Sequence, residues 1–166
     1  MAAFIRAAAR RCAIGAGLAA LLAASGAAAQ EKDRHAGYYY PPPTVTESYQ
    51  PEATTISGAS RVRRIGLISA ITNRSANASF APTYLMFVKG ADAEKLIIIG
   101  MGDYVSNIFQ ARALLAQLTA QARFTEAFKE VDAEHRLTFL DLLKMLGFDQ
   151  VTVSDGKSFT LQIAIK

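Results

Sequence analysis

The turn Ile99-Gly100-Met101-Gly102-Asp103 is the stretch whose spacing could bind a phosphate, because it joins an apolar run to a long amphipathic segment. Nucleotide-binding proteins place glycines there so that backbone N–H groups can approach phosphate at a helix N-terminus. In this chain Val105 stands where the third glycine would fall, and the lysine and hydroxyl residue of a Walker loop are missing. Asp103 would repel phosphate and is a favourable helix N-cap. We therefore predict a turn with a purely structural role, and Asp103 as the N-cap of the helix that follows it.

A second group of candidate residues is the polar cluster Asp132, Glu134 and His135. It offers one imidazole, whereas a zinc site in proteins generally uses several histidine or cysteine ligands. We therefore predict a solvated polar loop, with no metal site and no cofactor.

The N-terminal segment has the pattern of a cleavable secretory signal. Arg6, Arg10 and Arg11 precede the apolar run 13–24, and the small residues 27–29 form an A-x-A site that predicts cleavage near Ala29-Gln30. A membrane-spanning anchor is the alternative, but it needs about 20 apolar residues and this run is shorter. The paired arginines leave the twin-arginine route open beside the Sec default. We expect a periplasmic or secreted protein that meets the membrane only through its signal.

Removal of the signal changes the composition of the mature chain. The whole chain carries 18 Lys and Arg against 14 Asp and Glu, and the loss of three arginines leaves 15 against 14. This balance gives no electrostatic support for a nucleic-acid partner. The only cysteine, Cys12, also leaves, so we expect no disulfide and no thiol nucleophile. The chain also has no G-x-S-x-G motif, and an enzyme is disfavoured.

Residues 30–60 are polar and rich in turn-forming residues, and we predict a disordered Tyr/Pro-rich tail. The tract Tyr38-Tyr39-Tyr40 before three prolines is either part of a flexible tether or a docking segment with rigid aromatic surface. The candidate partner-binding residues are therefore Tyr38, Tyr39 and Tyr40, together with a basic cluster at Arg61, Arg63 and Arg64.

That basic cluster begins a segment, 61–72, that we predict to be a strand with Ile65, Leu67 and Ile71 on one face. The arginines could contact anionic head groups or cell-wall polymers. The alternative is a charged edge that discourages pairing between strands of different molecules.

The remaining segments predict the core of the fold. Apolar runs at 83–89 and 96–99 are separated by a short turn and indicate an antiparallel hairpin. Apolar residues at helical spacing follow to Arg123, and 124–131 continues as a second helical piece. Thr138 and Asp141 form the capping pattern of the next helix, Leu137 can staple onto Leu142, and Gly147 suits its left-handed C-terminus.

The chain ends in a predicted hairpin. The apolar residues of the two strands lie on the same face of the hairpin if Ser154-Asp155-Gly156 forms a three-residue loop, which pairs Val151 with Phe159. Gly156 would then take a left-handed conformation.

This order of elements predicts the α+β class: an antiparallel sheet of about five strands, with two or three helices packed on one face, in a single domain at 61–166.

The segments RHAGYYYPPP, RRIGLISAITN, FVKGADAEKLIIIGMGD, ARALLAQLTAQAR and TFLDLLKMLGFDQVTVSDG together resemble a family of small exported bacterial proteins. Its members are often labelled molybdopterin-guanine dinucleotide biosynthesis protein A. The resemblance implies, as one function, a nucleotidyltransferase of molybdenum-cofactor biosynthesis. The glycine-rich LAGGxSxRxGxDK-like start of such enzymes has no match in this chain, so no catalytic residue is carried over.

The function that the residues favour is a non-enzymatic binding or accessory domain at the cell envelope. Its partner would be an envelope protein or polymer, recognised through a sheet edge, the Tyr38–Pro43 tract or the Arg61–Arg64 cluster. The nucleotidyltransferase is the alternative.

Overall fold

The computed structural model describes residues 40–129 and 136–166. In chain order the elements are β1 (Val45–Tyr49), α2 (Arg61–Ala76), β2 (Tyr84–Lys89), β3 (Lys95–Gly100), α3 (Ile108–Ala122), α4 (Glu126–Lys129), α5 (Phe139–Met145), β4 (Gln150–Ser154) and β5 (Thr160–Ile165). The predicted signal, Tyr38, Tyr39 and the polar cluster at 132–135 lie outside the described residues.

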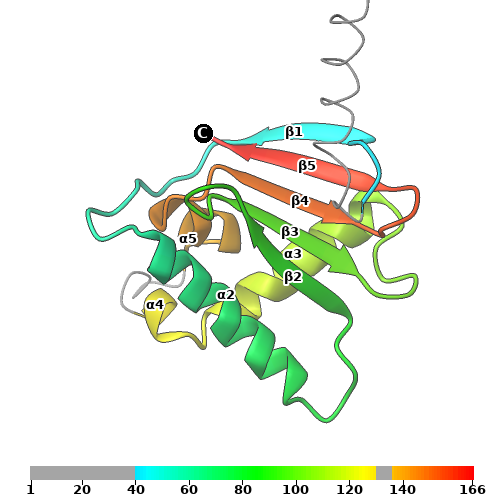
Figure 1. The fold of residues 1–166 in the computed structure, drawn as a ribbon, viewed down its shortest axis with the longest axis horizontal. Helices are drawn as coiled ribbons and strands as arrows, with labels where there is room; N and C mark the ends of the chain where they lie inside the picture. The colour runs from blue at the N-terminus through cyan, green and yellow to red at the C-terminus, as the bar shows by residue number, and fades with distance from the viewer. Residues whose placement is uncertain (1–39, 130–135) are drawn as a thin grey trace, which may run out of the picture. The chain divides into compact units, whose positions relative to one another are not determined.

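The sheet has five strands in the order β1-β5-β4-β3-β2 (Figure 1). The pairs β2–β3 and β4–β5 are antiparallel, whereas β3–β4 and β1–β5 are parallel. The predicted α+β class is therefore confirmed, but the prediction of a purely antiparallel sheet is wrong. The physical reason is the long connection through α3, α4 and α5, which returns the chain to the starting end of β3 and allows β4 to run parallel to it.

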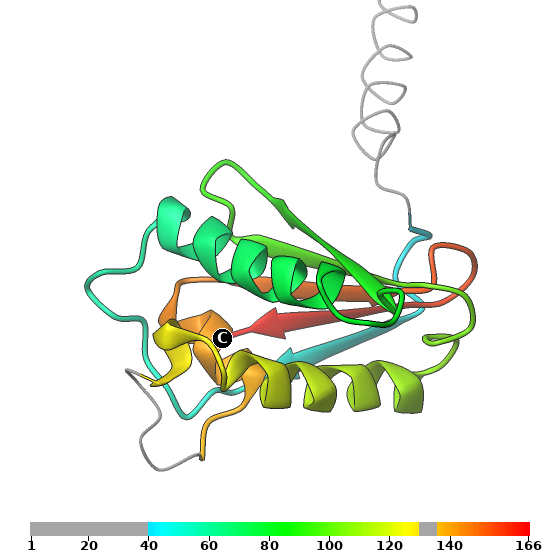
Figure 2. The same ribbon diagram turned by 90° about the horizontal axis from the view of Figure 1, so that it is seen from below.

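The two long helices, α2 and α3, both lie over the same face of the sheet (Figure 2). Strand side chains that alternate toward this face form the core with the inner faces of the helices, and Leu96, Ile98, Val151, Val153 and Leu118 are all essentially inaccessible to solvent. The opposite face of the sheet is covered by no helix of the described ranges (Figure 1).

The segment 61–76 is helix α2, so the prediction of a strand there is wrong. Ser60 is its N-cap, with a hydroxyl that accepts from the Arg63 N–H at 3.3 Å. The buried residues Arg64, Leu67, Ile68 and Ile71 follow helical spacing rather than alternation. The β-branched residues in the segment favoured a strand, but packing against the sheet selects the helical stripe.

Strand β1 falls within the predicted disordered tail, so that prediction is wrong for Val45–Tyr49. The strand pairs along β5, and the chain after it is tied to α5: the Ile56 N–H donates to the Met145 carbonyl at 3.0 Å. Only Val45, Glu47 and Tyr49 point inward. The sequence signal was weak because such an edge strand carries few apolar residues.

The start of α3 also differs from expectation. Asn107, rather than Asp103, is the N-cap, and its Oδ1 accepts from the N–H groups of Phe109 and Gln110 at 3.0 and 3.1 Å. Asp103 lies in the exposed loop before it.

The predicted start and end of α5 are confirmed. Thr138 and Asp141 form a reciprocal capping box, and Gly147 has φ +82°. The N–H groups of Gly147 and Phe148 donate to the carbonyls of Lys144 and Leu143, both at 2.9 Å, as in a Schellman end.

In the closing hairpin the apolar residues share one face, as predicted, and Gly156 has the predicted positive φ, +72°. The predicted register of the two strands is wrong. Val151 pairs with Ile163 rather than Phe159. The loop is longer because the Asp155 carboxylate accepts from the N–H groups of Lys157, Ser158 and Phe159 at 2.8 to 2.9 Å. One aspartate therefore organises a wider turn than a G1 bulge.

Gly147→Ala is expected to destabilise the protein by about 2 kcal/mol, because a Cβ there would force a left-handed alanine. The added Cβ would also lie 2.7 Å from Nη1 of Arg64. Gly66→Ala is the matched control, since a Cβ at this helical position meets nothing within 4 Å; it should stabilise by about 0.5–1 kcal/mol. Urea denaturation measures the free energy of unfolding of both variants. Equal changes in the two variants would contradict the role of Gly147 as the left-handed end of α5.

Candidate binding groove at the free edge of the sheet

Strand β2 forms one edge of the sheet, so one side of its backbone has no neighbouring strand among the described residues. The Met101 N–H donates to the Thr83 carbonyl at 2.8 Å, and this pair continues the β2–β3 register. Because hydrogen-bonded and non-hydrogen-bonded pairs alternate in an antiparallel ladder, the backbone groups of Tyr84, Met86 and Val88 point away from β3. An extended chain could pair with these groups.

A groove of about 530 Å³ runs between this strand and α2. From α2 it is lined by Arg61, Ile65, Ile68, Ser69, Thr72 and Asn73, and from β2 and its following turn by Met86, Phe87, Val88, Lys89, Gly90 and Ala93. The residues of α2 recur at three- and four-residue intervals and form one face of the helix. Ile65 is an exposed apolar side chain on the α2 wall, and Met86 and Val88 lie on the face of β2 that is turned toward α2. The groove therefore combines apolar and polar lining residues and lies beside the outward backbone groups of β2.

The charged residues of α2, and those among the described lining residues of the groove, are basic. Helix α2 carries Arg61, Arg63, Arg64 and Arg74 and has no acidic residue. Among the described residues that line the groove, Arg61 and Lys89 are basic and none is acidic. The carboxylate of Glu94, in the turn after β2, accepts from the Asp92 N–H at 3.0 Å and lies next to Gly90 at the end of the groove. A partner with negative charge would be favoured at this edge.

The structure separates the predicted partner-binding arginines. Arg61 lines the groove, and Arg63 lies exposed on the first turn of α2. Arg64 is buried and donates from Nε and Nη2 to the Asp92 carbonyl and from Nη1 to the Leu146 carbonyl at 2.8 Å. Arg64 is thus structural, whereas Arg61 lines the groove. Tyr40, the one described residue of the three tyrosines, is half-buried.

The sequence does not predict the groove, since the pattern of the segment that forms one wall predicts a strand. The signal that could have indicated it is the run of basic residues in 61–76 without a compensating acidic residue, on a segment with helical apolar spacing.

The glycine turn is explained by packing. A Cβ on Gly100 would lie 2.7 Å from the side chain of Val105, which is fully buried, so this position requires glycine for close approach. Gly102 has φ +61°, and α3 begins only at Ile108. The turn is therefore separated from the helix N-terminus at which a phosphate would be held.

Two further features bear on the kind of site. Over the ranges 40–129 and 136–166, no three His, Cys, Asp or Glu side chains lie where they could hold a metal ion together. Within the same ranges, no helix has the length and apolar character needed to cross a bilayer.

The fold and the groove define an α+β domain with an unpaired edge strand beside a basic helix. Comparisons of the chain with protein-family models, characterised proteins and solved structures give no match. The resemblance to exported bacterial proteins labelled as molybdenum-cofactor proteins stays a prediction.

Proposed function

We propose that this protein is an exported, non-enzymatic binding domain of the cell envelope that takes an extended acidic peptide segment as an added strand beside β2. The observation that carries this proposal is the row of outward backbone groups on Tyr84, Met86 and Val88 next to a groove whose charged lining is basic.

Strand addition uses both parts of the edge. Main-chain hydrogen bonds to β2 supply affinity for any extended chain, whereas side-chain pockets select the sequence. Alternate side chains of the peptide would point toward Ile65 and Ile68 on α2, and acidic residues near its end would meet Arg61 and Lys89. An envelope protein with an exposed segment of alternating apolar and acidic residues fits this chemistry.

A second copy of the chain fits less well. Two molecules paired antiparallel through β2 would bring their α2 helices together, and each α2 carries exposed Arg61, Arg63 and Arg74 with no acidic residue. Like charges at such an interface are unfavourable.

The test uses a six-residue acetylated peptide that alternates valine and glutamate, which matches the six residues of β2. We expect chemical-shift changes at the β2 amides and binding that weakens with added salt. The same peptide with lysine in place of glutamate should bind about tenfold more weakly, a difference of about 1.4 kcal/mol. Its fully N-methylated form should not bind, because it cannot donate main-chain hydrogen bonds.

Arg61→Glu is expected to weaken binding of the valine–glutamate peptide about tenfold by reversing a charge at the groove. Arg63→Glu is the matched control, since it makes the same change on the same helix turn outside the groove lining. Fluorescence anisotropy measures both dissociation constants. Equal effects of the two changes, binding of the N-methylated peptide, or self-association through β2 would contradict the proposal. Thermal stabilisation by GTP with Mg²⁺ alone would favour the nucleotidyltransferase alternative instead.

A further inference from the structure

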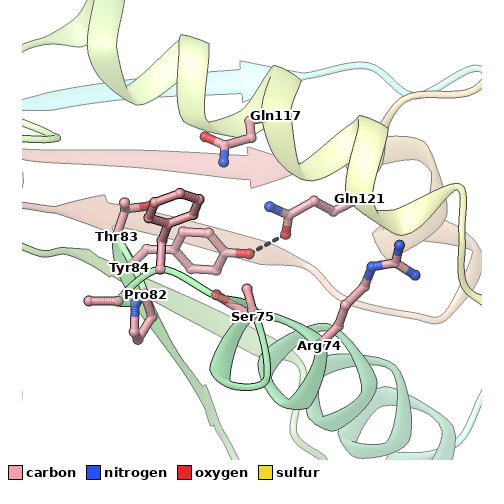
Figure 3. Close-up of a pocket in the computed structure, with 10 residues that line it drawn as sticks. Arg74, Ser75, Pro82, Thr83, Tyr84, Gln117 and Gln121 are labelled. Carbon is pink, nitrogen blue, oxygen red and sulfur yellow. Dashed lines mark hydrogen bonds between the residues drawn. The ribbon is translucent and has the colours of Figure 1, made fainter.

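A second hollow, of about 250 Å³, lies where the ends of α2 and α3 meet the start of β2, and it shares no lining residue with the groove. Figure 3 shows Ser75, Tyr84, Gln117 and Gln121 pointing toward one another from these three elements. Pockets for drug-sized ligands are roughly 300–1,000 Å³. This pocket therefore suits a smaller molecule, of about one ring.

The polar groups of the pocket are neutral hydroxyls and amides. The Tyr84 hydroxyl donates to Oε1 of Gln121 (Figure 3), which orients that amide and leaves its NH₂ group to donate. Burial raises the pKa of Tyr84, and contributions from Ser75 and Gln121 oppose it only in part, so the phenol stays a protonated donor. The Gln117 amide makes no hydrogen bond to the described residues, and its donors and acceptor are available to a ligand.

The charge around the pocket disfavours an anion. Ser75 is in the last turn of α2, and Gln117 and Gln121 are in the last two turns of α3, so both helices present their negative ends. Arg74, the one basic residue among the described lining residues, sits in that last turn of α2 with its guanidinium 4.5 Å from the centroid of the Phe124 ring. Its charge is thus opposed by the helix end and engaged by the ring.

The pocket also has an apolar platform. Phe80 lines it and is 86% exposed, so its ring is accessible to a ligand. A sugar ring has one face of C–H groups that can lie on an aromatic ring and a rim of hydroxyls that both donate and accept.

From this combination we infer that the hollow between α2, β2 and α3 binds a neutral hydroxyl-rich ring, namely a single pyranose sugar residue. The hydroxyls would bond to Gln117, Gln121 and Tyr84, and the apolar face of the ring would lie on Phe80. The site binds without cleaving, because glycoside hydrolysis uses a pair of carboxyl groups and the described lining has none. The pocket shares no lining residue with the groove, and sugar binding there does not depend on peptide binding.

The test is a titration of the isotope-labelled protein with N-acetylglucosamine, glucose and glucose 6-phosphate, followed through the side-chain NH₂ signals of Gln117 and Gln121. We expect saturable shifts with the neutral sugars, with dissociation constants of the order of millimolar for one shallow subsite. The phosphorylated sugar should bind more weakly. Short oligomers of N-acetylglucosamine show whether the site takes a sugar residue of a polymer or a free sugar. Binding that becomes tighter with length indicates a polymer, and binding that does not change with length indicates a free monosaccharide.

Two exposed residues give variants that spare the fold. Gln117→Ala and Phe80→Ala should each weaken sugar binding at least about fivefold, as expected for the loss of one hydrogen bond or one stacking face. Gln50→Ala and Phe109→Ala are the matched controls, since Gln50 is exposed, Phe109 is 78% exposed, and neither lines the pocket. No shift at any sugar concentration, equal losses in the control variants, or tighter binding of glucose 6-phosphate would overturn the inference.

Discussion

Replacing Arg64 with methionine is expected to lower the free energy of unfolding by about 3 kcal/mol, because hydrogen bonds to a buried charged group are lost and the carbonyls left behind stay desolvated. Arg64 is only 8% exposed, and its guanidinium bonds to the carbonyls of Asp92 and Leu146. It thereby joins α2 to the β2–β3 turn and to the C-terminal end of α5. A cation also suits that position, since the end of a helix is negative.

Arg63→Met is the control for this prediction. Arg63 is the neighbouring arginine on the same turn, is exposed, and should change stability by no more than about 0.5 kcal/mol. The measurement is urea denaturation of both variants at equal ionic strength. If the two changes cost the same, the bonds of Arg64 to the carbonyls do not stabilise the fold as argued.

Asp141→Asn is expected to cost about 3 kcal/mol at neutral pH, because the side chain accepts four hydrogen bonds while only 2% exposed. Asp141 accepts from the backbone N–H and hydroxyl of Thr138 at 2.9 and 2.6 Å, from the Tyr49 hydroxyl at 3.0 Å and from the Glu52 N–H at 2.9 Å. It therefore caps α5 and fastens β1 and the following loop to that helix. An asparagine would point its NH₂ group at one of these donors.

The same carboxylate makes stability depend on pH. Burial works to raise the pKa of Asp141, but the hydrogen bonds from Thr138, Glu52 and Tyr49 together outweigh it, and the pKa lies below its usual value. A carboxyl with a lowered pKa in the folded state stabilises the protein above its unfolded pKa of about 3.9. That contribution is lost as the pH falls through the folded pKa.

The difference in stability between the wild type and Asp141→Asn should therefore be largest near neutral pH and shrink below about pH 4. Asp155, whose pKa is also lowered although burial opposes this, is present in both proteins and cancels in the comparison. Asp149→Asn is the control, since Asp149 is exposed and its side chain makes no hydrogen bond to the described residues. A difference that stays constant between about pH 7 and pH 3 would contradict the role of the ionised form.

The prediction for α5 succeeded because its signals are local. The cap, the third residue after it and the glycine that ends the helix lie within one short segment, and their hydrogen bonds close within that segment. The hairpin β2–β3 succeeded for the same reason, since a short turn joins two apolar runs.

The prediction for α2 failed because its apolar residues fit both a strand and a helix. Buried Arg64 belongs to the helical stripe, and its burial depends on carbonyls that lie 28 and 82 residues away in the chain. No local pattern marks an arginine that will be satisfied in this way. The candidate site was affected too, because Arg61, Arg63 and Arg64 were treated as one cluster although only Arg61 lines the groove.

The sequence by itself determined the α+β class, the β2–β3 hairpin and the capped helix α5, because turn residues, caps and apolar periodicity act between neighbours in the chain. Only the tertiary structure decided that β1 joins β5, that β3 and β4 run parallel, and that β2 is left at an edge beside α2. These features depend on which distant segments exclude water together, and that choice is made by the packing of the whole sheet rather than by any one segment. The pocket arises where such distant elements meet, because α3 joins α2 and β2 in lining it.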